Sequence, residues 1–288
     1  MNPGWAGPVW GEPSPATDAP VPVRARAGAS AANYRADGGE SADFIVLAAS
    51  VAGPVHRLGG GRCEDSYAWV KPRPGRLGLL IADGVSTAGR GGEGADLAVE
   101  AAARYLSSCE GWGETECRGA AARASAELMS AGHVLARGKA AELSTTFVVA
   151  LVAARVAGAD VVLGRVGDST AFTLTAGLWQ ELFIPPDDDD LQRVATDVLP
   201  FSGDAGNDPI ETASAYLDVG TAIVLVTDGL ANPLRDGPTT VAPGLAEVLG
   251  EGSGRAPSPL ALAAAADFSR RGCQDDRTIV VAWPRPSG

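Results

Sequence analysis

The chain has 288 residues, of which 45% are hydrophobic and 20% are charged, and its formal net charge is -12 at pH 7. A chain of this length can bury a sizeable core, in one large domain or in two small ones. The excess of acidic residues argues against a nucleic-acid backbone as the main partner, and it suits a protein that gathers cations.

Residues 1–42 are rich in Pro, Ala and Gly, with scattered charges. Such a segment cannot bury enough apolar surface to offset the conformational entropy that ordering costs. We therefore expect a disordered tail over residues 1–42 and one folded domain over residues 43–288.

After the tail, hydrophobic periodicity and turn residues predict strands and helices in alternating groups. In chain order these are strands at 44–51, 66–70 and 77–82, helices at 94–107 and 117–140, strands at 144–154 and 160–175, a polar loop at 184–212, a strand at 221–227, helices at 238–249 and 258–271, and a strand at 278–283. Strands grouped apart from helices favour an α+β sandwich, with helices outside an antiparallel core.

The cysteines and the N-terminus bear on the compartment. The four cysteines, Cys63, Cys109, Cys117 and Cys273, show no C-x-x-C spacing. This indicates neither a zinc ribbon nor a disulfide framework and favours reduced thiols in a cytoplasmic protein. No basic region followed by an apolar core opens the chain, so we expect no signal peptide, and no apolar run is long enough to cross a bilayer.

Aspartates punctuate three apolar runs. Asp83 and Asp228 each follow one run and precede a glycine, whereas Asp275 stands just before another run. A single Asp-Gly after a strand is usually a turn. However, a carboxylate after one strand and a carboxylate before its antiparallel neighbour reach the same edge of a sheet. Doubly wound parallel sheets gather functional groups only at the carboxyl ends of strands, so the mixed placement favours an antiparallel sheet.

With Asp168, which follows the run ending in Val166-Gly167, these aspartates make four carboxylates beside buried strands. Such groups would repel one another and suffer desolvation unless a cation neutralised them. Hard oxygen ligands suit Mg2+ or Mn2+. The sequence therefore predicts a divalent metal site.

Six short motifs follow one another along the chain, and their order is more specific than any one of them. They are Glu64-Asp65-Ser66, Asp83-Gly84, Ser144-Thr145-Thr146, Gly167-Asp168-Ser169, Thr227-Asp228-Gly229-Leu230 and Asp275-Asp276-Arg277-Thr278. In order and approximate spacing, this set resembles the metal-dependent protein phosphatases of the 2C type, the PPM family, and in particular a bacterial subgroup. The match spans roughly residues 44–284.

The resemblance implies a four-layer α-β-β-α sandwich, in which two antiparallel sheets are flanked by helices and the metal site lies at one edge. In this arrangement Asp83 would bridge two Mg2+ or Mn2+ ions, and the carbonyl of Gly84 would complete one of them. Asp228 and Asp275 would hold the other ion.

Three further carboxylates take their roles from the same resemblance. Glu64 and Asp65 match an acidic pair that supports the cluster, directly or through bound water. Asp168, together with Asp228, matches a position that recruits a weaker third ion in some members.

The chemistry implied is hydrolysis of phosphoserine or phosphothreonine in proteins by a metal-activated water. No covalent enzyme intermediate is needed. This agrees with the lack of a nucleophilic triad, because Ser86 and Ser144 have no evident histidine partner.

The phosphate-binding region departs from the family pattern. Many members carry an arginine where this chain has Gly60, and Arg62 and the pair His56-Arg57 are the nearby basic residues. We favour His56 and Arg57 for phosphate contact. The alternative, an exposed basic dipeptide before a glycine loop, remains open.

The leading hypothesis is a cytoplasmic protein serine/threonine phosphatase that uses two or three Mn2+ or Mg2+ ions, with Asp83 and Asp228 at its catalytic centre. Its partners would be phosphorylated proteins, either a Ser/Thr kinase or that kinase's substrates. An alternative is a pseudophosphatase that keeps the fold as a regulatory binding module. A third hypothesis, an unrelated two-metal phosphoesterase, would require parallel strands.

Overall fold

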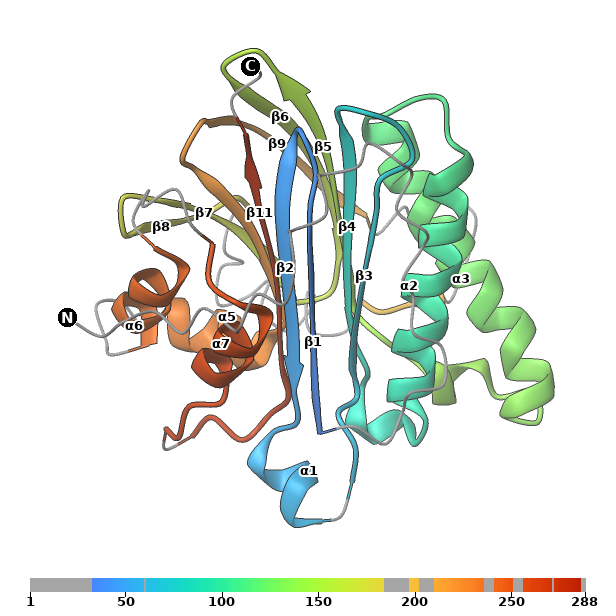
Figure 1. Ribbon diagram of the computed structural model, residues 1–288. Helices are drawn as coiled ribbons and strands as arrows, with labels where there is room; N and C mark the ends of the chain where they lie inside the picture. The colour runs from blue at the N-terminus through green and yellow to red at the C-terminus, as the bar shows by residue number, and fades with distance from the viewer. Residues whose placement is uncertain are drawn as a thin grey trace, which may run out of the picture.

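The computed structural model describes residues 33–59, 61–183, 197–201, 210–235, 241–250, 256–270 and 272–285. In this part of the chain, two antiparallel sheets pack face to face and helices cover both outer faces, as Figure 1 shows. The predicted four-layer α+β sandwich is confirmed.

The six-stranded sheet has the order β1-β2-β11-β10-β7-β8, and the five-stranded sheet has the order β3-β4-β5-β6-β9. The strands of the first sheet are β1 (Tyr34–Glu40), β2 (Phe44–Val51), β11 (Arg277–Pro284), β10 (Ala222–Val226), β7 (Thr170–Thr175) and β8 (Leu178–Glu181). Those of the second are β3 (Asp65–Val70), β4 (Arg76–Asp83), β5 (Phe147–Arg155), β6 (Gly158–Val166) and β9 (Glu211–Asp218).

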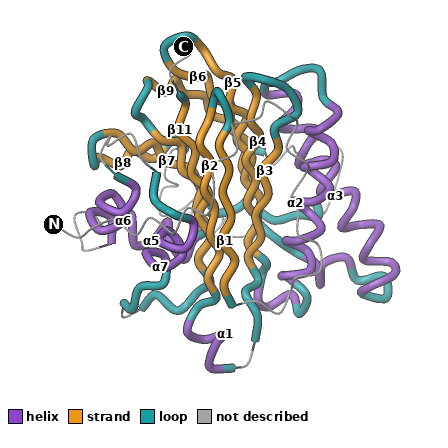
Figure 2. The backbone as a smooth tube through the Cα atoms, viewed as in Figure 1, coloured by secondary structure: helices purple, strands orange, loops and turns teal. Residues whose placement is uncertain are grey.

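The helices form two separate outer layers (Figure 2). Helices α2 (Gly91–Ser108) and α3 (Glu114–Leu135) cover the five-stranded sheet, and α5 (Asp228–Arg235), α6 (Val241–Leu249) and α7 (Pro259–Ala266) cover the six-stranded sheet. The short helix α1 (Pro54–Leu58) lies beyond one end of the sheets, and single 3-10 turns occur at Ser86–Ala88 and Ala140–Leu143. No helix in the described segments is long and apolar enough to span a membrane.

Three apolar clusters hold the layers together, one between the sheets and one under each helical layer. In β10, Ile223 and Leu225 face the other sheet, whereas Val224 and Val226 face the helices. Successive side chains of a strand point to opposite faces, so a strand covered on both faces reads as a continuous apolar run. This is why the central strands were predictable from hydrophobicity alone.

The predicted boundary of the tail was wrong at its end, because Tyr34–Glu40 forms the edge strand β1, paired with β2 along its whole length. Its composition is unfavourable for a strand, but its contacts with the domain are specific. The guanidinium of Arg35 donates to the backbone carbonyl of Asp65 and pairs with Asp96 at 3.3 Å. Residues 1–32 lie outside the described residues.

The other differences concern single elements. The strand predicted at 160–175 divides at Gly167 into β6 and β7, which belong to different sheets. Strand β9 begins inside the loop predicted at 184–212, most of which lies outside the described residues. It is an edge strand with many exposed positions, so its hydrophobic signal is weak.

A glycine substitution tests the packing of β1. A Cβ atom at Gly39 would lie 2.7 Å from Cη2 of the buried Trp69, so Gly39→Ala should lower the free energy of unfolding by about 1–3 kcal/mol. The matched control is Gly244→Ala in α6, where a Cβ atom meets nothing within 4 Å. That change should raise stability by about 0.5–1 kcal/mol. Urea unfolding of both variants checks this, and equal stability of Gly39→Ala and wild type would contradict the packing described.

Candidate metal centre

Strand direction brings the predicted carboxylates of the six-stranded sheet to one edge. Strands β10 and β11 are antiparallel, and Val226, two residues before Asp228, pairs with Ile279, four residues after Asp275. Asp228 therefore leaves one strand at the edge where Asp275 enters the next. Asp228 also begins α5, so the free backbone N–H groups of the first helical turn favour its negative charge.

The five-stranded sheet contributes a second pair. Asp65, at the start of β3, lies directly opposite Asp83, at the end of β4, in the antiparallel register. Like charges at directly opposite positions of two strands are destabilising. The two sheets thus each present two aspartates at the same end of the sandwich, and we call this end the acidic edge.

Burial and the charges of neighbouring carboxylates raise the pKa values of three of these groups. Burial, followed by the charges of Asp65 and Asp228, raises the pKa of Asp83 well above its usual range. Burial and the charge of Asp276 do the same to the pKa of Asp65, which is 1% exposed. Burial, then Asp168 and Asp275, raises the pKa of Asp228 to about 6.

Asp168 joins the group from the loop between β6 and β7. Burial raises its pKa, against the opposing effects of a backbone hydrogen bond and of Arg235 and Arg165. Gly167, just before it, has φ +91°, a conformation that few residues other than glycine adopt, and a Cβ atom there would lie 2.8 Å from Thr146. The Gly-Asp order is thus required by the turn.

Hydroxyl groups fix the backbone of Asp83. The amide of Asp83 donates to Oγ1 of Thr146 at 3.1 Å, and Oγ1 of Thr145 donates to the carbonyl of Asp83 at 2.8 Å. The following residue, Gly84, touches the start of α2 so closely that a Cβ atom would lie 2.3 Å from the carbonyl carbon of Gly91. The Ser-Thr-Thr and Asp-Gly motifs therefore form one rigid support.

A second hydroxyl network lies behind Asp65. Oγ1 of Thr227 donates to Oδ2 of Asp65 at 2.8 Å and accepts from the amide of Thr278 at 2.9 Å. The threonines of the Thr-Asp-Gly and Asp-Asp-Arg-Thr motifs thus orient one carboxylate oxygen of Asp65. Sequence reasoning used these threonines only as part of the motifs and assigned them no role.

The site fits a hard divalent cation in its donor chemistry. Among the described residues, Oδ1 of Asp65 and Oε2 of Glu64 are buried and have no hydrogen-bond partner. A buried anionic oxygen without a partner is costly, and a cation would relieve that cost. Among the described residues, no three His, Cys, Asp or Glu side chains are already arranged so that they could hold a metal ion. The fit therefore rests on the unpartnered oxygens and on the all-oxygen donor set.

The basic residues near this edge are all engaged with acids. His56 lies between Asp276 and Glu64, with Nδ1 2.9 Å from Oδ1 of Asp276 and Nε2 3.8 Å from Oε2 of Glu64. Arg57, by contrast, pairs with Asp267 at 2.8 Å and donates to the hydroxyl of Tyr34. Of the predicted pair, only His56 contacts an acid of the acidic edge.

Two more arginines lie beside the start of α2. Arg90 pairs with Glu93 at 2.5 Å, and Arg62 lies 3.5 Å from the same carboxylate. Both are about one-third exposed. A Cβ atom at the neighbouring Gly92 would contact Glu64, so this charged group adjoins the acidic edge.

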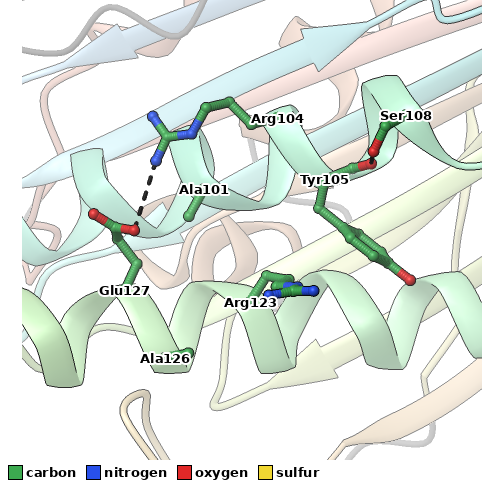
Figure 3. Close-up of a pocket in the computed structure, with 7 residues that line it drawn as sticks. All are labelled: Ala101, Arg104, Tyr105, Ser108, Arg123, Ala126 and Glu127. Atoms are coloured by element: carbon green, nitrogen blue, oxygen red, sulfur yellow. Dashed lines mark hydrogen bonds and ion pairs between the residues drawn. The ribbon is translucent and has the colours of Figure 1, made fainter.

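A groove of about 400 Å3 lies elsewhere, between α2 and α3 (Figure 3). It is lined by Ala101, Arg104, Tyr105, Ser108, Arg123, Ala126 and Glu127, and Arg104 pairs with Glu127 across it at 3.7 Å. Arg104 is 13 residues beyond Gly91, or roughly 20 Å along the helix axis. The groove is therefore separate from the acidic edge.

The raised pKa of Asp228 predicts an unusual stability effect. In the metal-free protein, folding disfavours the ionised form of Asp228. The protein should therefore lose stability as the pH rises from 3.8, the ordinary pKa of an aspartate, through about 6, the pKa of Asp228 in the folded protein. Asp228→Asn should therefore stabilise the metal-free protein at pH 8, on the order of 1–3 kcal/mol. The gain should shrink below pH 6 and vanish below pH 3.8.

Thermal unfolding in chelator across this pH range checks the prediction. The control is Asp160→Asn, which removes an exposed aspartate paired with Arg155 and should change little. A loss of stability in Asp228→Asn at pH 8 would show that its charge is not repelled in the folded state.

Comparison with known proteins agrees with this geometry. Residues 52–256 match the family model described as protein phosphatase 2C. No curated protein sequence matches the chain. Solved structures are similar in fold at low sequence identity, and three of them illustrate the range.

The serine/threonine phosphatase of S. agalactiae is 15% identical with a TM-score of 0.60, over 84% of this chain and 100% of that one. The catalytic domain of the phosphatase PstP, described in complex with two manganese ions, is 17% identical with a TM-score of 0.54, over 84% and 98%. RsbX, described in complex with magnesium, is 15% identical with a TM-score of 0.53, over 87% and 100%. The matched residues contain the Asp83, Asp168 and Asp228 motifs, and the chain belongs to the protein phosphatase 2C family of serine/threonine phosphatases.

Proposed function

We propose that this protein hydrolyses phosphoserine and phosphothreonine in other proteins, with Mn2+ or Mg2+ bound at the acidic edge. The observation that carries the proposal is the convergence of aspartates from both sheets at one end of the sandwich, where two buried carboxylate oxygens have no hydrogen-bond partner among the described residues. The solved relatives described with magnesium or manganese support the choice of metals.

In this proposal the metal ligands are those predicted from the motifs. Asp83, Asp228 and Asp275, with the carbonyl of Gly84, would hold two ions, and Glu64, Asp65 and Asp168 would support them or hold a third. Ions held by these residues would supply a water of lowered pKa as the nucleophile and would stabilise the charge that develops on the phosphate.

The chain's own residues fix the ligand geometry. The backbone of Asp83 is held by hydrogen bonds, since its carbonyl accepts from Oγ1 of Thr145 and its amide donates to Oγ1 of Thr146. Thr227 donates to one oxygen of Asp65, and the other is buried without a hydrogen-bond partner among the described residues. Rigid placement of charged groups lets them stabilise a transition state without reorganisation. The carboxylates are therefore held where repulsion alone would separate them.

For substrate binding, we propose that His56 contacts the phosphate, because its Nε2 faces the edge beside Glu64. Arg57 anchors α1 to Asp267 and Tyr34. Phosphorylated proteins would be the substrates, in a cytoplasmic pathway with a Ser/Thr kinase.

Hydrolysis assays test the proposed activity. Wild type with Mn2+ should hydrolyse p-nitrophenyl phosphate and a phosphothreonine peptide, and chelator should abolish both reactions. Asp228→Ala should lower kcat/KM by at least about 100-fold, because it removes a metal ligand at the centre of the site. Asp160→Ala, an exposed aspartate on the β5–β6 hairpin, is the control. If wild type with Mn2+ hydrolyses these substrates no faster than Asp228→Ala does, the enzymatic proposal is wrong and the binding-module alternative is favoured.

The two basic residues of α1 should behave differently. His56→Gln should raise KM for the phosphothreonine peptide about tenfold, because a hydrogen bond to a charged phosphate is worth about 1.5 kcal/mol. Arg57→Gln should change KM by less than about threefold, since its partners are Asp267 and Tyr34. Steady-state kinetics measure both, and the opposite order of effects would assign the phosphate contact to Arg57.

A further inference from the structure

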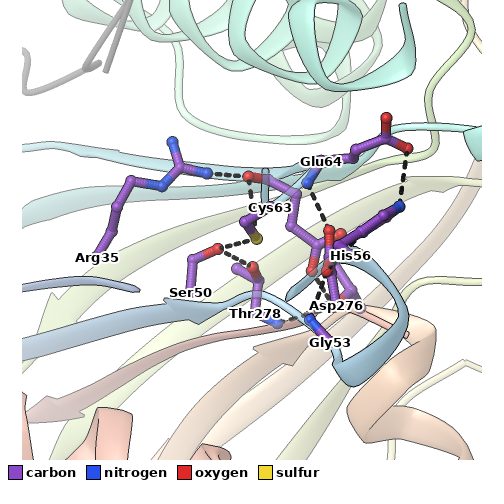
Figure 4. Close-up of polar contacts among 10 residues, drawn as sticks. Arg35, Ser50, Gly53, His56, Cys63, Glu64, Asp276 and Thr278 are labelled. Atoms are coloured by element: carbon purple, nitrogen blue, oxygen red, sulfur yellow. Dashed lines mark hydrogen bonds and ion pairs between the residues drawn. The ribbon is translucent and has the colours of Figure 1, made fainter. Parts of the chain in front are cut away.

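A carboxylate that the motifs left without a role, Asp276, lies at the junction of three segments (Figure 4). Its side chain is buried, with 4% of the residue exposed. Oδ1 accepts from the amide of Gly53 at 2.6 Å and lies 2.9 Å from Nδ1 of His56, and Oδ2 accepts from the amide of Glu64. One carboxylate therefore joins the start of β11 to α1 and to the start of β3.

Both oxygens of Asp276 are thus used by donors of the protein. This distinguishes it from Asp65 and Glu64, each of which has a buried oxygen without a hydrogen-bond partner among the described residues. Of the roughly four acceptor sites of a carboxylate, three are taken up here by nitrogen atoms of the protein, so Gly53, His56 and Glu64 are its main partners. Asp276 can affect the site through the groups that it holds, besides the effect of its charge on the pKa of Asp65.

Asp276 positions both the backbone and, through His56, the side chain of Glu64. It accepts from the backbone amide of Glu64, and it fixes the imidazole whose Nε2 lies 3.8 Å from Oε2 of the Glu64 side chain. Gly53 completes the unit, because a Cβ atom there would lie 2.2 Å from the carbonyl oxygen of Gln274. The loop that carries Asp275 is therefore packed directly against the residue that precedes α1.

We propose that Asp276 is a positioning residue that locks Glu64 and His56 into one unit at the metal edge, so that metal affinity and phosphate contact depend on a side chain that touches neither. This inference rests on the proposed function. Groups that orient metal ligands through hydrogen bonds typically change metal affinity by 10- to 100-fold when they are removed.

The experiment compares Asp276→Asn with Asp267→Asn. An asparagine at 276 keeps the size of the side chain, but it turns one acceptor into a donor and loses the charge that orients His56. Asp267 is the matched control, because it also anchors α1, through Arg57, without touching His56 or Glu64. Titration calorimetry with Mn2+ alone should show at least tenfold weaker binding for Asp276→Asn and a change below threefold for Asp267→Asn.

A second readout follows the imidazole itself. The chain has only two histidines, so the ring nitrogens of His56 can be observed by NMR with His133 as an internal reference. Asp276→Asn should shift the Nδ1 signal of His56 and leave His133 unchanged, in metal-free protein and without any catalytic assay. If Asp276→Asn does not fold, His56→Gln replaces it in the calorimetry, and it should also weaken Mn2+ binding, by about threefold or more.

The outcomes separate this inference from the proposed function. Wild type that binds no Mn2+ and hydrolyses no phosphopeptide would overturn the proposed function. Wild type that binds Mn2+, with Asp276→Asn or its substitute His56→Gln within twofold of it, would overturn only the positioning role. Equal losses in Asp276→Asn and Asp267→Asn would also overturn it, because loosening of α1 would then explain both.

Discussion

The structure depends on holding like charges together at one end of two packed sheets. Asp65 and Asp83 come from one sheet, and Asp228 and Asp275 flank strands of the other. Burial and mutual repulsion raise the pKa of three of them, so the ionised cluster opposes folding. A cation that binds there would remove the repulsion and also join the two sheets. Under the proposed function, the same carboxylates would therefore link metal binding to the packing of the two sheets.

That arrangement explains why small and hydroxylated residues surround the acids. Threonine hydroxyls bond the backbone of Asp83 and one oxygen of Asp65, and Gly84 allows α2 to approach within backbone contact. Arg277, wholly buried, stacks on the ring of Phe268 at 4.2 Å and donates to the carbonyl of Cys273. It thereby ties the loop before β11 to the core. These contacts fix the acids and the loop before β11, some through the backbone and some through side-chain atoms.

The central strands and the aspartates at their ends could be predicted from the sequence, because strands buried on both faces give long apolar runs with clear ends. The edge strands β1, β8 and β9 could not. Strand β1 contains two glycines and two acids, and it forms because Gly38 and Gly39 fit against Leu47 and Trp69. Asp276 was missed for a related reason: it adjoins Asp275 in the sequence, but one is exposed and the other is buried behind the site. Two identical neighbours cannot be told apart without the strand's orientation.

The basic side of the site follows from the same electrostatics. Next to a cluster of aspartates, an unpaired cation would be attracted into the cluster and would compete with a metal ion. The structure instead pairs these four basic groups with acids: His56 with Asp276, Arg57 with Asp267, and Arg62 and Arg90 with the shared Glu93. Pairing weakens the attraction of each cation for a phosphate dianion. Under the proposed function, the ions would therefore supply most of the affinity for phosphate, and contacts with the surrounding peptide would have to provide the discrimination between substrates.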